Sequence, residues 1–205
     1  LGVVAFFYAQ IIASITVSLF TWMKSKFSQY IIYRQYTASL LSDFYTYAWP
    51  IIPATASWWI MTMSDRWFIS AFLGLTSNGI YAIALKVPAL LLMMNTVFSL
   101  AWKDSAIIYY DDANKDAYFT TIFTHYFRFL TTTVIVLILL AKPLIILFID
   151  SAYEAAWQYS GILLIATLFH AFSLFWSAGF HGAKKTTPFF RSSVIGAGVN
   201  IVGNF

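Results

Sequence analysis

The chain has 205 residues, of which 60% are hydrophobic and 10% are charged, and its net charge is +4. Soluble proteins carry about 25% charged residues, so this composition excludes an ordinary soluble domain. Apolar stretches of about 20 residues, enough to cross a hydrocarbon core of about 30 Å as a helix, recur along the sequence. The lack of cysteine excludes disulfides and thiol chemistry. We therefore expect an all-α, polytopic bundle of transmembrane helices.

The apolar stretches predict about six membrane helices in chain order. They cover approximately residues 1–23, 44–74, 79–102, 118–149, 157–178 and 189–205. Pro50 and Pro53 predict a bend near the start of the second helix, and Pro143 predicts a kink at the far end of the fourth. A short turn at residues 75–78 is expected to make the second and third helices antiparallel. The chain begins and ends inside apolar runs, so we expect it to be part of a longer protein.

The segment 27–43 is too short and too polar to cross a bilayer. Its pattern predicts an amphipathic stretch that lies along the membrane interface and links two blocks of helices. We expect a domain boundary there.

Basic residues alternate between the connections. Lys and Arg occur in segments 24–43, 103–117 and 179–191, whereas residues 75–78 hold neither and residues 150–156 hold only acidic charges. Lys and Arg in short loops mark the cytoplasmic side of a membrane protein. We therefore expect the three basic segments to be cytoplasmic.

Three cations, Arg66, Lys86 and Arg128, lie inside apolar stretches. A charge within a membrane is costly, so it marks a partner, a wet cavity or a ligand. Asp65 offers Arg66 a structural ion pair as an alternative, although adjacent helix residues point about 100° apart. Lys86 has no acidic residue within one helical turn. For Arg128 the alternative is that its long side chain extends along the helix and places the guanidinium group at the cytoplasmic interface. We interpret the three cations as lining a cavity that accepts an anion.

Polar residues recur at helical spacing on most of the predicted helices. Asp65, His125, His170, Asn95 and Asn200 are the further candidates for a polar cavity. The histidines are candidate proton relays, and the spacing from Lys86 puts Asn95 on the opposite face of an ideal helix. Helix packing through small and polar residues is the alternative.

No P-loop, HExxH or GxSxG motif is present. We therefore expect no catalytic residue, no metal and no cofactor, and we expect neither an enzyme nor a nucleic-acid partner.

One pattern resembles a known family. The sequence DRWFISAFLG at residues 65–74, followed by NGIYA at residues 78–82 and then Lys86, resembles the polysaccharide-exporter branch of the multidrug/oligosaccharidyl-lipid/polysaccharide exporter superfamily. Shorter matches to the same pattern follow in chain order. They are Ala101-Trp102, KPLI at residues 142–145, YEAA at residues 153–156 and VNI at residues 199–201. The likeness covers residues 44–205.

The resemblance implies a flippase of the Wzx type, which moves an undecaprenyl-diphosphate-linked O-antigen or capsule repeat unit across the bacterial inner membrane by alternating access. Such proteins have two six-helix lobes around a central cavity. Residues 1–26 would be the last helix of the first lobe, and residues 44–205 a truncated second lobe. The resemblance implies that Arg66 and Lys86 are the cations at the positions of this sequence that match the family pattern. The expected partners are the lipid-linked oligosaccharide, the bilayer, the polysaccharide polymerase and the chain-length machinery.

Three alternatives stay open. A cation-coupled multidrug exporter of the same superfamily would favour buried acids, of which Asp65 is the one expected within a span. A membrane enzyme, such as an O-antigen polymerase or a lipid-linked glycosyltransferase, would carry its catalytic residues in a large outer loop, and the outer connections here are short. A purely structural subunit would not explain Lys86.

Overall fold

The computed structural model describes residues 2–25, 29 and 37–204. It divides into two units, Leu1–Phe44 and Tyr45–Phe205. The first unit contains helix α1 (Gly2–Ser25) and the beginning of α2 (Ala38–Ala48). Most of the predicted linker 27–43 lies outside the described residues, so its interfacial role stays a prediction.

The second unit is built from helices joined by short connections. After α2 it contains α3 (Ile51–Phe68), the π-helix η2 (Ile69–Leu73), α4 (Gly74–Ala84), α5 (Lys86–Ile108), α6 (Lys115–Phe148), the 3₁₀ helix η3 (Ser151–Ala156), α7 (Trp157–Gly182) and α8 (Thr187–Gly203). Near Pro50, where a bend was expected, the helix is interrupted: α2 ends before Trp49 and α3 begins after Pro50. Helix α6 runs through Pro143 to Phe148.

The prediction of a turn at residues 75–78 is wrong, because these residues are helical and belong to α4. The break lies instead at Gly74, whose φ of 84° is a conformation that only glycine adopts readily. The second glycine of this region, Gly79, serves a different purpose: a Cβ there would lie 3.0 Å from Cε1 of Tyr153. Gly79 thus lets α4 approach η3.

Four segments of the described chain are long and apolar enough to cross a membrane: Val4–Ser25, Ala38–Ala84, Lys115–Phe148 and Ser151–Gly182. The expectation of an α-helical membrane protein agrees with this finding, although six spans were expected. Helices α5 and α8 are not among the four. The described part of α8 has 17 residues, and α5 contains the polar residues Asn95, Lys103 and Asp104.

The core of the second unit lies between α5, α6 and α7. Each of these helices buries one stripe of residues spaced three or four apart, which is the repeat of a helix face. On α6 the stripe consists of Tyr126, Leu130, Val134, Leu137, Ala141 and Ile145. Aromatic rings fill one part of this core: Trp102 stacks on Phe175 with ring centroids 4.4 Å apart and donates its indole N–H to the Phe175 carbonyl at 3.0 Å. The three helices thus bury part of the apolar surface that the composition of the chain predicts.

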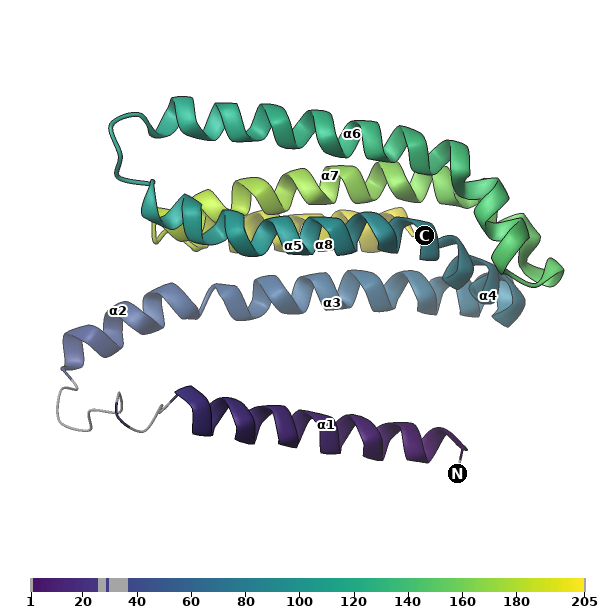
Figure 1. The fold of residues 1–205 in the computed structure, drawn as a ribbon, viewed down its shortest axis with the longest axis horizontal. Coiled ribbons are helices and arrows are strands. Elements are labelled where there is room, and N and C mark those ends of the chain that lie inside the picture. Colours follow the sequence, from purple (N-terminus) through teal and green to yellow (C-terminus); the bar gives the residue numbers. More distant parts are fainter. Residues whose placement is uncertain (1, 26–28, 30–36, 205) are drawn as a thin grey trace. The chain divides into compact units, whose positions relative to one another are not determined.

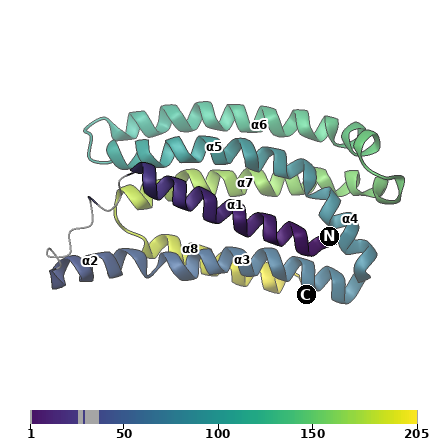
Figure 2. The ribbon, with the colours of Figure 1, turned by 60° about the horizontal axis from the view of Figure 1, so that its bottom comes forward.

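Helices α3 and α8 form a second packed pair, which contacts the α5–α6–α7 group through α7. The rings of Trp58 on α3 and His170 on α7 stack at 3.9 Å between centroids. The connections at residues 109–114 and 183–186 lie at one end of this unit, whereas α4 and η3 lie at the other (Figures 1 and 2). We call the first of these the basic end, because Lys103, Lys115 and Lys184 lie near it.

Candidate functional site

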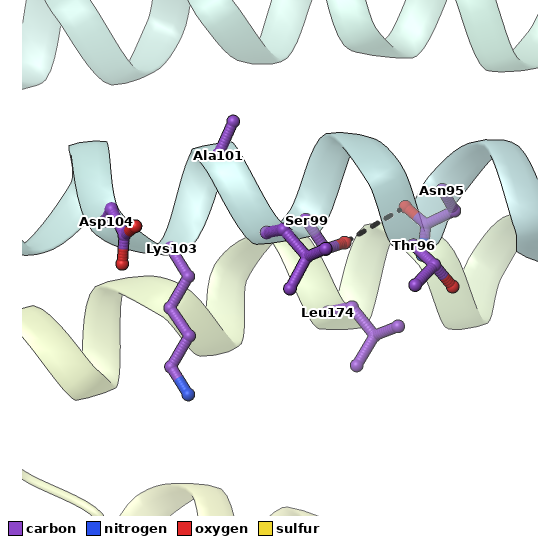
Figure 3. A pocket seen from close by; sticks show the side chains of 8 residues that line it. Asn95, Thr96, Ser99, Ala101, Lys103, Asp104 and Leu174 are labelled. Atoms are coloured by element: carbon purple, nitrogen blue, oxygen red, sulfur yellow. Dashed lines mark hydrogen bonds between the residues drawn. The ribbon is translucent and has the colours of Figure 1, made fainter. Parts of the chain in front are cut away.

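A polar strip runs along α5 toward the basic end. Asn95, Ser99 and Lys103 are spaced four residues apart and therefore lie on one side of the helix. Figure 3 shows them in succession along α5, with Thr96 next to Asn95 and Leu174 of α7 close by. They border a cavity of about 510 Å³. Its lining residues are Asn95, Thr96, Ser99, Leu100, Ala101, Lys103, Asp104 and Leu174.

Asn95 anchors this strip in the core, since only 2% of its surface is exposed. Its Oδ1 accepts a hydrogen bond from the Tyr126 hydroxyl at 2.6 Å and a weaker one from the Ser99 hydroxyl at 3.4 Å. The Tyr126 hydroxyl also lies 3.0 Å from the carbonyl oxygen of Ala171. These contacts join α5, α6 and α7 at one point and fix the Asn95 side chain.

The Asn95 amide has more hydrogen-bonding capacity than these contacts use. An amide has two N–H donors and an oxygen with two lone pairs, whereas its partners within residues 37–204 are the hydroxyls of Tyr126 and Ser99. Because Asn95 also lines the cavity, a ligand there can use the remaining capacity.

The remaining polar groups complete the chemistry of the cavity. The Thr96 hydroxyl donates to the Leu92 carbonyl at 2.8 Å, so its oxygen retains lone pairs that can accept. Lys103 is exposed, and among the described residues no acid lies within ion-pair distance of its ammonium. Asp104, on the cavity rim, is the one acid in the lining. The site thus offers amide, hydroxyl and ammonium groups on an otherwise apolar wall, which suits a ligand with hydroxyls and a negative charge.

A second polar cluster joins α3, α4 and α8 at the other end of the unit. Asp65 Oδ1 accepts from the amides of Asn200 at 3.0 Å and Asn204 at 2.8 Å, and Oδ2 lies 3.4 Å from the Tyr81 hydroxyl. The Ser64 hydroxyl lies 3.1 Å from Asn200 Oδ1. We call these residues the Asp65 junction.

The ion pair that Arg66 offered to Asp65 is not formed in the described chain, because the carboxylate is occupied by amide and phenol donors. Arg66 instead points to an exposed face. This agrees with the roughly 100° separation of adjacent helix residues. The alternative of a local ion pair is therefore wrong.

The three predicted cavity cations do not line the cavity beside Asn95. Lys86 is exposed while Asn95 is buried, as expected for opposite faces of α5. Arg128 is also exposed, since it lies two residues from both Tyr126 and Leu130 and so about 160–200° away from the buried stripe of α6. Lys103, which sequence reasoning assigned to a cytoplasmic segment, is the cation that borders the cavity. The role of Arg66, Lys86 and Arg128 in binding stays a prediction.

The remaining polar candidates fall at three places. His125 borders a smaller cavity of about 220 Å³ between α5 and α6, together with Asn95 and Tyr126. His170 stacks on Trp58, which is a packing role. Asn200 belongs to the Asp65 junction. The structure thus joins Asn200 to Asp65 and brings His125 beside Asn95, while His170 lies apart from both pairs.

The predicted site did not include four residues that the structure places at the two polar clusters: Ser99, Lys103, Tyr126 and Asn204. The four-residue spacing of Asn95, Ser99 and Lys103 was a signal that could have identified the strip. The pairing of Asn95 with Tyr126 has no such signal, because it depends on how α5 meets α6.

In the described ranges, no group of three or more His, Cys, Asp or Glu residues is arranged to hold a metal ion. Comparison with protein families, with curated proteins and with solved structures finds no match to this chain.

Proposed function

We propose that this chain is part of a flippase of the polysaccharide-exporter type, which moves an undecaprenyl-diphosphate-linked oligosaccharide from the inner to the outer leaflet of the bacterial inner membrane. In this proposal the basic segments 24–43, 103–117 and 179–191 face the cytoplasm. The observation that carries it is the cavity on α5, in which Asn95, Ser99 and Lys103 form a polar strip on a helix that packs against the membrane-type helices α6 and α7. Such a strip is costly in a bilayer unless it serves a polar ligand.

The lining supports a ligand of this chemical class. Amide and hydroxyl groups exchange hydrogen bonds with sugar hydroxyls, and a lysine ammonium binds phosphate oxygens through charge-assisted hydrogen bonds. The prenyl tail can remain in the hydrocarbon while the head group crosses. Arg66, Lys86 and Arg128, which all lie on exposed faces, are proposed as further cation contacts along the route.

The alternatives receive less support. A multidrug exporter for cations needs an acid that is free to meet its substrate, whereas Asp65 is held by the amides of Asn200 and Asn204. A polymerase or glycosyltransferase needs a catalytic loop at the outer end, where the connections are formed by the short helices α4 and η3. Neither element carries a constellation of catalytic side chains.

The proposal is tested in proteoliposomes that contain undecaprenyl-diphosphate-linked oligosaccharide. An impermeant glycosidase is added outside, and the fraction of sugar that it removes is measured over time. With the protein present, we expect removal to continue beyond the outer-leaflet share, because the inner-leaflet lipid is brought out. Removal that stops at the share found in protein-free vesicles contradicts the proposal. Transport of a cationic dye by the same vesicles would favour the multidrug exporter.

A further inference from the structure

We infer that the α5 cavity binds the substrate in one orientation, with the diphosphate at Lys103 and the sugars extending inward to Ser99 and Asn95. This inference rests on the proposed function and names the contacts of the substrate within that site. It concerns the loading step, before the head group crosses.

The position of Lys103 along α5 determines which end of the site meets the diphosphate. Lys103 lies five residues before Ile108, the last residue of α5, which is about 7–8 Å along the axis from the basic end. A lipid diphosphate has its phosphates near the leaflet surface, because its tail is held in the hydrocarbon. Lys103 therefore lies at a depth where the phosphates of a lipid in that leaflet are found, and Asn95 does not.

The direction of the polar strip determines where the sugars lie. Asn95 lies eight residues, or about 12 Å, further along the axis from Lys103. Ser99 lies halfway between them, and Thr96 lies beside Asn95. These three residues are uncharged, so the strip changes from a cation at the leaflet surface to neutral hydrogen-bonding groups deeper in. A head group whose charge is at one end and whose hydroxyls are at the other fits this order in one direction only.

Asn95 lies at the inner end of the strip. Its Oδ1 lies 2.6 Å from the Tyr126 hydroxyl, which holds the side chain in place, and the residue lines the cavity with Thr96 and Ser99. An amide has two donors and two acceptor lone pairs, more than these contacts use, so it can exchange a hydrogen bond with a sugar hydroxyl, which need not carry a charge.

The inference predicts that the two ends of the strip respond to different parts of the substrate. We would measure binding of fluorescent undecaprenyl-linked glycans to the detergent-solubilised protein, comparing diphosphate with monophosphate linkage and a single sugar with a full oligosaccharide. Lys103→Gln should weaken binding of the diphosphate-linked form about tenfold or more, since hydrogen bonds to charged groups are worth about 1.5–3 kcal/mol. The loss should be smaller for the monophosphate. Lys103→Arg should restore most of the affinity.

At the other end, Ser99→Ala should weaken binding of the oligosaccharide while leaving the single-sugar lipid unchanged, because one sugar next to the phosphates stays close to Lys103. Asp104→Asn should strengthen binding of the diphosphate, since it removes the acid at the rim. Lys115→Gln is the matched control: it removes a cation near the same end that stacks on Tyr110 and does not line the cavity.

Two outcomes overturn the inference without touching the proposed function. One is wild-type affinity of Lys103→Gln for the diphosphate-linked glycan in a protein that still flips lipid. The other is a Ser99→Ala defect that is equal for the single sugar and the oligosaccharide.

Bulk anionic lipid is a second source of phosphate near Lys103, so flipping by Lys103→Gln is also measured in phosphatidylcholine vesicles with and without phosphatidylglycerol. A defect confined to vesicles with phosphatidylglycerol assigns Lys103 to the bulk lipid and overturns the inference. Failure of the wild-type protein to flip lipid refutes the proposed function itself.

Discussion

Asn200 donates its side-chain amide to Asp65 Oδ1 at 3.0 Å, across the interface between α8 and α3. Four residues later, directly after the end of α8, Asn204 donates to the same oxygen at 2.8 Å. The carboxylate is thus met by neutral donors from a neighbouring helix, and the adjacent Arg66 takes no part. Hydrogen bonds between membrane helices of this kind hold the helices in register, because the unpaired groups would otherwise face an apolar environment.

The Asp65 junction leads to a prediction about stability. Asp65→Leu should lower the thermal stability of the detergent-solubilised protein, because two amides lose their acceptor, at a cost of about 1–3 kcal/mol. Asp65→Asn should retain most of the stability, since its side-chain oxygen can still accept from both. Circular dichroism during heating measures the difference. Asp111→Leu, at an exposed position between α5 and α6, is the control; an equal loss in that variant would argue against a role for the junction.

A second prediction concerns the point where α5, α6 and α7 meet. Tyr126→Phe keeps the ring that stacks on Phe98 at 4.4 Å but removes the hydroxyl that lies 2.6 Å from Asn95 Oδ1. We expect a loss of about 1 kcal/mol in the free energy of unfolding, the usual size for such a hydrogen bond. Denaturant titration measures it. Tyr159→Phe, at an exposed position on α7, should have no effect, and a neutral Tyr126→Phe would show that ring packing alone holds the three helices together.

The topology can be tested with single cysteines, because the chain has none of its own. Cysteines at Asn114 and Thr187, which are exposed at the basic end, should be shielded from an impermeant thiol reagent in intact cells. Cysteines at Thr76 and Ala152, which are exposed at the opposite end, should react. The reason is the distribution of Lys and Arg among the loops. Reaction at Asn114 or Thr187 from outside would reverse the assignment.

A fourth prediction concerns the approach of α7 to α5. A Cβ at Gly182 would lie 2.9 Å from the carbonyl oxygen of Ala106 and equally close to Cδ2 of Tyr110. Because a backbone carbonyl cannot rotate away, Gly182→Ala should destabilise the protein by about 1–3 kcal/mol. Gly198→Ala, where a Cβ meets nothing within 4 Å, should be neutral or stabilising because alanine favours helix. Thermal unfolding distinguishes the two, and equal midpoints would show that the helices shift apart freely.

The region from Gly74 to Asn78 folds differently from the sequence-based prediction. The sequence predicted the chain reversal at residues 75–78, yet these residues are helical and the break lies at Gly74. Both positions contain residues that tolerate a turn, so local sequence could not choose between them. The choice depends on how closely α4 must approach η3, where Gly79 faces the ring of Tyr153.

The helical class, the long apolar segments and the opposite faces of Lys86 and Asn95 could be predicted from the amino-acid sequence, because hydrophobic length and the 100° step of a helix are local properties. It could not determine which polar residues meet. Asp65 bonds to residues 135 and 139 positions away, and Asn95 bonds to a tyrosine 31 positions away. Such pairs depend on which helix faces pack together. In an apolar chain many helix faces are similar enough to pack against one another, so these pairs follow from the three-dimensional packing and could not be predicted from local sequence.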